Sequence, residues 1–181
     1  GVHSGDSTAV LPPFSINKKI INEIEQKSIQ LAKALNVKGL LNIQFAVKEG
    51  ILYILEANPR ASRTMPFVAK VTGNQIIKAG TLLMLGYSLD FVKKETDYLN
   101  GSTKKIAIKK AIFPWSRFPA EDTMLGPEMK ATGEVLGIGS NFGTALNKAY
   151  AAAGVLINKK QKGVFISLSD KEKPNFVEIA K

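Results

Sequence analysis

Gln44, Glu56 and Asn58 are the side chains whose types and spacing best suit metal chemistry in this sequence. Mg²⁺ takes oxygen ligands, usually one or two carboxylates, while substrate phosphates and waters complete its coordination shell. Glu56 and Asn58 are two residues apart, so in an extended strand they point to the same side. The three residues are therefore a candidate site for a metal ion bound to phosphate.

Gln44 can join the other two only under a geometric condition. Residues 41–47 and 51–55 read as two strands of a hairpin with a glutamate–glycine turn signal between them. Opposed residues of an antiparallel pair have a constant index sum, and Gln44 and Glu56 share a face when that sum is even. We therefore expect an odd loop, residues 48–50, with its glycine left-handed. A two-residue loop would place the two side chains on opposite faces.

Glu56 also ends an apolar run, where a carboxylate is costly unless it is paired or bound to a cation. A strand-end glutamate that simply meets solvent is the alternative, because glutamate is mostly exposed.

Arg60 and Arg63 lie close to this group in a chain whose basic residues are otherwise almost all lysine; Arg117 is the third arginine. The rigid guanidinium fork suits phosphate or carboxylate, so the pair suggests anion recognition. Salt bridges to Asp or Glu are the alternative. His3, the single histidine, stands among glycines whose backbone N–H groups could meet a nucleotide, although a structural role is the more common one for a lone histidine.

Composition limits the class of protein. The chain has 181 residues, of which 45% are hydrophobic and 22% charged, which is enough for a real core of one or two domains. Cysteine is absent, which fits a cytoplasmic protein. The net charge of +10 raises the alternative of a basic nucleic-acid-binding module. The lysines, including Lys109 and Lys110, are scattered in pairs without interleaved aromatic residues, so we expect solvated surface or contacts with acidic domains rather than nucleic acid.

The remaining pattern predicts an α+β chain with mostly antiparallel sheet. Helices are expected over 16–35, with Ser15 as N-cap, and over 66–72, 75–85 and 141–153. A strand is expected over 106–113, ending at a proline. Residues 87–103 read as a connector and 115–140 as irregular. A strand over 163–168 and the start of a helix over 176–180 close the sequence. The most apolar run, 79–85, is too short to span a bilayer, which takes roughly 20 residues.

Several blocks of the sequence resemble the ATP-grasp core of the carbamoyl-phosphate synthase large subunit. The blocks are Gly1-Val2-His3-Ser4-Gly5-Asp6-Ser7, Asn42-Ile43-Gln44-Phe45-Ala46-Val47 and Leu55-Glu56-Ala57-Asn58-Pro59-Arg60-Ala61-Ser62-Arg63-Thr64, continued by 66–73, 110–114 and 125–135. Their spacing matches as well, and the resemblance covers essentially the whole chain. The Glu-x-Asn-Pro-Arg-x-Ser-Arg block and the Gly-Pro-Glu-Met block make it specific.

The resemblance implies roles for individual residues. Gln44, Glu56 and Asn58 would hold two Mg²⁺ or Mn²⁺ ions against the phosphates of ATP, and Arg60 would lie near the transferred phosphoryl group. Gly1, Val2, His3 and Ser4 would line the nucleotide. Two metals and an arginine suit phosphoryl transfer, which depends mostly on positioning and charge neutralisation.

The resemblance also implies an organisation. Residues 1–86 would be the C-terminal part of the second, carbamate-phosphorylating ATP-grasp unit, 87–154 an extension or connector, and 155–181 the start of a truncated α/β regulatory domain resembling methylglyoxal synthase. The chain would thus be an interior fragment, inactive by itself and weak in binding Mg·ATP.

The parent would make carbamoyl phosphate from bicarbonate, glutamine-derived ammonia and two ATP, for arginine and pyrimidine synthesis. Its expected partners are a glutamine-hydrolysing small subunit and the rest of the large subunit, with no nucleic acid and no membrane. Self-association with a second copy is a further option. The rival enzymes are another ATP-grasp carboxylate–amine ligase and biotin carboxylase.

Overall fold

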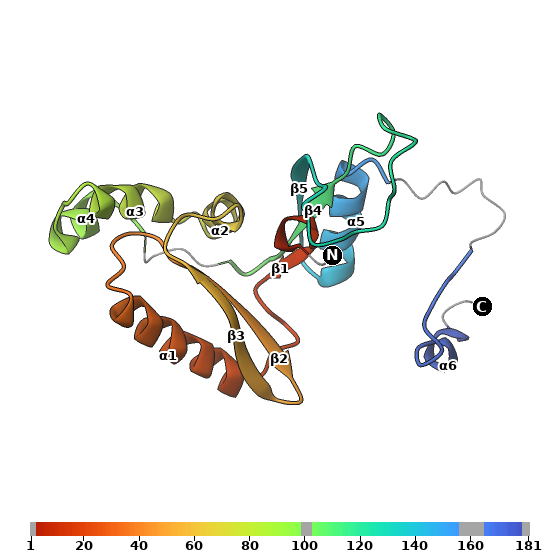
Figure 1. Ribbon diagram of the computed structural model, residues 1–181, viewed down its shortest axis with the longest axis horizontal. Helices are drawn as coiled ribbons and strands as arrows, with labels where there is room; N and C mark the ends of the chain where they lie inside the picture. Colours follow the sequence, from red (N-terminus) through yellow and green to blue (C-terminus); the bar gives the residue numbers. More distant parts are fainter. Residues whose placement is uncertain (1–2, 99–102, 156–164, 179–181) are drawn as a thin grey trace.

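The computed structural model describes residues 3–98, 103–155 and 165–178. Two antiparallel sheets organise these residues, and helices accompany both, so the expected α+β class is confirmed (Figure 1). The hairpin sheet consists of β2 (Asn42–Lys48) and β3 (Ile51–Asn58), and the three-stranded sheet has the order β1-β4-β5. Among the described residues, no helix is long and apolar enough to cross a membrane.

Helix α1 (Lys18–Ala34) lies along the hairpin and contacts β3. Its apolar side chains recur at helical spacing, which the sequence shows clearly. The predicted N-cap, Ser15, is wrong, because the side chain of Asn17 accepts the hydrogen bond from the backbone N–H of Ile20 at 2.9 Å. An asparagine there satisfies one of the N–H groups that the first helical turn leaves without a partner.

Three short helices follow the hairpin: α2 (Thr64–Thr72), α3 (Ile76–Met84) and α4 (Leu89–Glu95). The first two agree with the predicted helices. The connector expected over 87–103 is wrong in its first part, because α4 forms there and buries Val92 completely. The Ser88 hydroxyl caps α4 by accepting from the N–H of Phe91 at 3.2 Å, a signal that the sequence contained.

The three-stranded sheet joins distant parts of the chain. β1 (Ala9–Leu11) pairs with β4 (Ile106–Ile112), and β4 pairs with β5 (Gly133–Gly139). β4 stops before Pro114, as expected. β5 contradicts the irregular structure expected over 115–140, since its three glycines hid the strand pattern.

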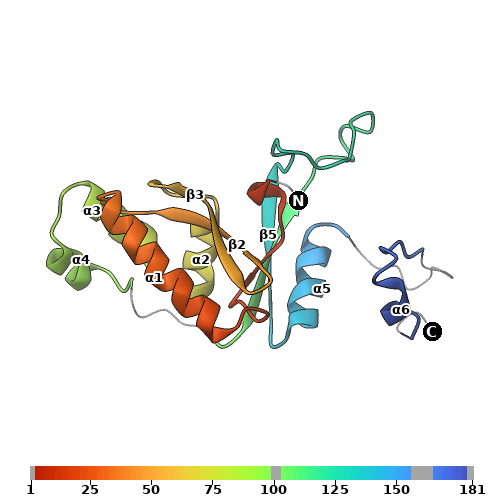
Figure 2. The same cartoon turned by 60° about the horizontal axis from the view of Figure 1, so that its bottom comes forward.

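Helix α5 (Phe142–Ala152) covers this sheet at very close range, and Figures 1 and 2 show it beside β4 and β5. Ile108, Ala145 and Ala149 form the buried cluster between sheet and helix. A Cβ added to Gly137 would lie 2.2 Å from the carbonyl oxygen of Ala145, so the backbone of β5 approaches the helix where no other side chain fits. Two of the glycines that hid β5, Gly137 and Gly139, are therefore needed for packing.

The C-terminal expectations hold only in part. Residues 163 and 164 lie outside the described residues, and 165–168 form no strand, with the Phe165 side chain 93% exposed. The short helix α6 (Lys173–Phe176) begins before the predicted 176–180, and Pro174 stands in its first turn, where proline's fixed φ is favourable.

Gly137→Ala should lower the free energy of unfolding by about 1–3 kcal/mol, because the new methyl group collides with the backbone of α5. Urea unfolding of the variant and the wild type measures the difference. Gly133→Ala is the matched control, since it lies on the same strand with open space around its Cβ position. Equal destabilisation by both changes would contradict the close-packing argument.

Candidate functional site

The turn of the hairpin differs from the expected one. Lys48 opposes Ile51, so the loop is the two-residue Glu49–Gly50, not the predicted three residues. Both loop residues have positive φ, 54° and 77°, as a type I′ turn requires, and this turn matches the twist of the strands. Gly50 is left-handed as predicted, but the predicted loop length is wrong.

Gln44 and Glu56 nevertheless lie directly opposite each other. The register shifts by one residue between Phe45, which opposes Ile54, and Gln44, which opposes Glu56. Leu55 is the extra residue of this β-bulge. The bulge offsets the even loop, so the expected shared face is present for a reason that the sequence pattern did not reveal.

One oxygen of Glu56 is the centre of the resulting group. Oε1 accepts hydrogen bonds from Nε2 of Gln44 at 2.7 Å and from Nδ2 of Asn58 at 3.0 Å. Asn42 opposes Asn58 on the same face and adds a fourth polar side chain, which the sequence pattern did not indicate. The Glu56 carboxylate is exposed, so the group is open to a ligand.

The chemistry of this donor set fits a magnesium-like ion that shares its shell with phosphate. It offers one carboxylate and two amide oxygens, which is less than a complete octahedron. Among the described residues, no cluster of three or more His, Cys, Asp and Glu could hold a metal by itself. The amide nitrogens now face Glu56, so both amides would turn about their last torsion to present oxygen.

Arg60 follows the hairpin, ahead of α2. Its guanidinium is exposed, and Nη1 donates to the carbonyl oxygen of Ala61 at 3.0 Å. An exposed arginine held by one backbone contact keeps most of its donors available to an anion. No carboxylate of the described residues pairs with Arg60.

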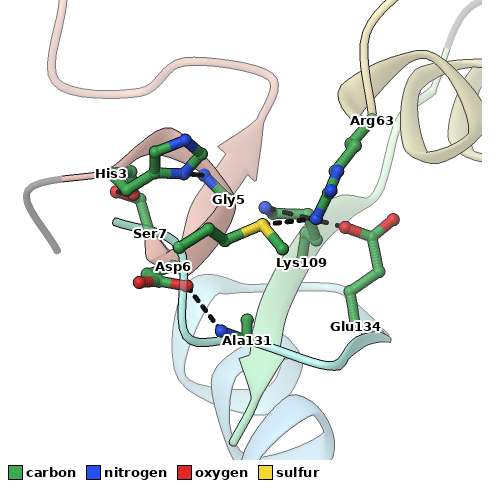
Figure 3. Close-up of polar contacts among 9 residues, drawn as sticks. His3, Gly5, Asp6, Ser7, Arg63, Lys109, Ala131 and Glu134 are labelled. Atoms are coloured by element: carbon green, nitrogen blue, oxygen red, sulfur yellow. Dashed lines mark hydrogen bonds and ion pairs between the residues drawn. The ribbon is translucent and has the colours of Figure 1, made fainter. Parts of the chain in front are cut away.

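The predicted nucleotide-lining residues fall in or beside the 3₁₀ turn η1 (Ser4–Asp6), while Gly1 and Val2 lie outside the described residues. Nδ1 of His3 accepts from the N–H of Gly5 at 2.9 Å, so the ring caps the turn (Figure 3). The Ser4 side chain is exposed. The turn therefore orders His3 through its own backbone.

Asp6 fixes this turn to a segment 124 residues further along the chain. Its buried carboxylate accepts from the N–H of Lys130 at 3.0 and 3.1 Å and from that of Ala131 at 2.8 Å. Burial by itself raises the pKa of Asp6, but these hydrogen bonds and the nearby His3 outweigh burial and hold the pKa below its ordinary value.

Arg63 points from the start of α2 toward η1 and β5 (Figure 3). Its Nη1 contacts the sulfur of Met129, and the same sulfur lies against Gly5. A cleft of about 250 Å³ opens here, lined by Gly5, Arg63, Pro66 and residues 131–134. Of the two arginines singled out, Arg63 belongs to this cleft and Arg60 to the end of the hairpin.

Lys109 contradicts the expectation of solvated lysines. It is 4% exposed, and its Nζ lies 3.7 Å from Oε2 of Glu134 on β5. Lys110 is half-buried with its ammonium 4.3 Å above the ring of Tyr150. Sequence reasoning missed Lys109, Met129 and Glu134 as residues of the cleft region. The position of Lys109 inside an apolar strand was the one signal that could have identified it.

Comparison with known proteins shows to which family the chain belongs. The family model described as "Carbamoyl-phosphate synthase L chain, ATP binding domain" matches residues 1–92. The chain is 44% identical to the carbamoyl phosphate synthase large chain, C-terminal section, of Aquifex aeolicus, and 45% identical to the corresponding section from Methanocaldococcus jannaschii. Each match covers 100% of this chain but only 36% and 30% of the relative, so the chain spans about a third of their length.

A solved structure supports the fold. The ADP complex of purK, N5-carboxyaminoimidazole ribonucleotide synthetase, superposes with a TM-score of 0.57 at 16% identity, over 82% of this chain and 40% of that one. Together the fold and the matches define a class, the ATP-binding domain of an ATP-grasp ligase. The chain belongs to the family of the carbamoyl-phosphate synthase L chain ATP-binding domain and is homologous to the large chain of that ligase.

Asp6→Asn should lower the free energy of unfolding at pH 7 by about 2 kcal/mol, because the backbone N–H groups of Lys130 and Ala131 lose a charged acceptor. Since folding lowers the pKa of Asp6, its contribution is complete above the ordinary pKa of about 3.9 and is lost as the pH falls through the lower folded value. The gap between wild type and variant should therefore close in acid. Urea unfolding between pH 7 and pH 2 measures it.

Asp90→Asn serves as the control for Asp6, because the Asp90 side chain is 91% exposed and its ion pair with Lys93 spans 3.9 Å. This substitution should change stability by less than about 0.5 kcal/mol. A gap for Asp6→Asn that stays constant down to pH 2 would contradict the ionised, hydrogen-bonded carboxylate.

Proposed function

We propose that this chain carries the metal- and phosphate-binding half of the carbamate-phosphorylating site of a carbamoyl-phosphate synthase. The parent ligase would make carbamoyl phosphate from bicarbonate, glutamine-derived ammonia and two ATP. The convergence of Gln44 and Asn58 on the carboxylate of Glu56 is the observation that carries the proposal. Membership of the ATP-binding-domain family supports ATP as the nucleotide that binds beside this group.

Gln44, Glu56 and Asn58 would hold Mg²⁺ or Mn²⁺, two ions in all, against the phosphates of ATP. Bound there, the metal would neutralise phosphate charge during transfer. Glu56 provides the charged ligand, and the two amides, both hydrogen-bonded to its Oε1, would turn to present their oxygens beside it. Asn42 lies opposite Asn58 in the last pair of the hairpin, at the end away from the turn, and extends the polar face there.

Arg60 would bind the transferred phosphoryl group. Its exposed fork has donors free for a phosphate oxygen, and it stands two residues beyond Asn58. Gly1, Val2, His3 and Ser4 would line the nucleotide. The ordering of His3 by the N–H of Gly5 supports this role, since a ring held in place costs less entropy on binding.

The assignment to the second ATP-grasp unit is supported by relatives that are themselves described as C-terminal sections of the large chain. In this proposal residues 1–86 complete that unit, 87–154 extend it, and 155–181 begin a regulatory domain.

The rest of the large subunit is the first partner that we propose. Many large apolar side chains are exposed on the hairpin, including Val47, Ile51, Tyr53 and Ile54, and exposed apolar surface of this kind marks an interface. We further propose that the parent binds a glutamine-hydrolysing small subunit and associates with a second copy of itself. Its proposed location is the cytoplasm.

Glu56→Gln in the full-length protein should reduce ATP formation from ADP and carbamoyl phosphate by at least about 100-fold, because the metal loses its charged ligand. A coupled assay for ATP measures the rate. Glu49→Gln removes a carboxylate from the turn of the same hairpin, where the side chain is exposed, and should leave the rate within about twofold.

Full activity of Glu56→Gln would show that this carboxylate is structural and that the proposed site is wrong. A wild-type protein that makes no ATP in this assay would assign the ligase to another substrate.

Arg60→Lys should lower kcat at least about tenfold while thermal stability stays unchanged, because lysine keeps the charge but loses the fork. Arg117→Lys is the matched control, an exposed arginine in the loop after β4. Steady-state kinetics with a melting curve for each variant measures both effects. Equal kcat values for the two variants would remove Arg60 from the proposed site.

A further inference from the structure

The bulge at Leu55 decides which face of the hairpin Glu56 occupies. From the turn to the Phe45–Ile54 pair, the index sum of opposed residues is odd, and from the Gln44–Glu56 pair onward it is even. Leu55 is the residue at which the sum changes. Bulges of this kind often stand next to active sites and re-aim a side chain.

A ladder without the bulge would sort the side chains differently. Glu56 would then oppose Ile43, and Gln44 would oppose Leu55, because a slip of one residue moves a strand's side chains to the other face. The carboxylate would lie beside Ile43 and Phe45, where it has no polar partner and its burial is costly. The bulge instead gathers Asn42, Gln44, Glu56 and Asn58 on one face.

The two-residue turn makes this extra residue necessary. Glu49 and Gly50 adopt the left-handed conformations of a tight turn. With this turn, the residue numbers of each opposed pair next to it add up to an odd sum. The Leu55 side chain is 64% exposed, so burial in the core does not explain the extra residue.

We propose that Leu55 is a positioning residue for the metal-binding group. Its backbone, as the single extra residue of β3, turns Glu56 and Asn58 onto the face of Gln44, and its side chain is not required. The inference rests on the proposed function, because Glu56 is taken as the metal ligand.

Two insertions of the same residue in the full-length protein test the proposal. A glycine inserted directly after Leu55 adds a second extra residue and should move Glu56 and Asn58 to the wrong face. The Mn²⁺ concentration that half-saturates ATP formation from ADP and carbamoyl phosphate should then rise at least about tenfold. The matched control inserts a glycine after Gly50, where the space is open and the Gln44–Glu56 pair can persist, and should change that concentration by less than about twofold.

Leu55→Ala separates backbone from side chain. It keeps the residue count and should behave like the control insertion. Unchanged Mn²⁺ dependence after the insertion at Leu55 would overturn the proposal. An equal loss in the turn insertion or in Leu55→Ala would also overturn it, since the hairpin would then be sensitive to any change or to the side chain itself.

Cysteine pairs report the register without any need for activity or for the insertion variants to fold. The chain has no cysteine of its own, and Ile43 opposes Ala57 in the bulged register. Ile43→Cys with Ala57→Cys should form a disulfide on oxidation, whereas Ile43→Cys with Glu56→Cys should not, because opposed Cβ atoms lie within bonding range. Mass spectrometry of the linked peptides distinguishes the two.

A disulfide at the second pair instead of the first would overturn the inference. The two proposals can fail separately. Normal Mn²⁺ dependence of Glu56→Gln would remove the metal role of Glu56 and leave the register result intact. Weakened Mn²⁺ dependence of Glu56→Gln, together with normal Mn²⁺ dependence of the insertion after Leu55, would remove only the positioning role of Leu55.

Discussion

Alternation of side chains along paired strands is the constraint on which the candidate site depends. In a two-stranded hairpin, every residue belongs to one face or the other, and a shift of one position exchanges the two sets. The polar group around Glu56 exists because a two-residue turn and a one-residue bulge are combined. Either feature alone would separate Gln44 from Glu56. The apolar residues gain from the same arrangement, since Ile43, Phe45 and Ile54 keep the opposite face to themselves.

A second constraint joins the start of the described chain to the segment just before β5. The carboxylate of Asp6 binds backbone N–H groups 124 and 125 residues away, and β1 pairs with β4 beside it. The η1 turn, Met129 and Arg63 meet at this place, so the His3 turn is held against β5 and the start of α2. A buried carboxylate is tolerated there because three hydrogen bonds replace the water that it loses.

The sheet around β4 shows how packing and charge are balanced. Glycines on β5 allow α5 to approach the backbone closely, and this approach buries Ile108 between small alanines. Lys109, the next residue along β4, is also buried and has Glu134 across the sheet as its partner. A buried lysine without that carboxylate would be costly.

The sequence by itself determined the elements with strong local patterns. α1, the hairpin strands, α3, β4 and α5 followed from apolar periodicity and from the proline and glycine residues that end them. The residue types at 44, 56, 58 and 60 indicated metal and phosphate chemistry without any coordinates, because hard oxygens and guanidinium groups suit few other ligands.

Tertiary structure decided what local pattern could not express. The loop length and the bulge at Leu55 depend on how the two strands of the hairpin pair. The strand β5 and the burial of Lys109 depend on contacts between residues further apart in the chain. The glycines of β5 predict irregular structure from sequence, because the helix that packs against them is not visible there. A lysine is likewise expected to be solvated when its carboxylate partner is not known. The types of side chain at the site were thus readable from the sequence, whereas the face on which they meet was settled by strand register, which is a property of two segments together.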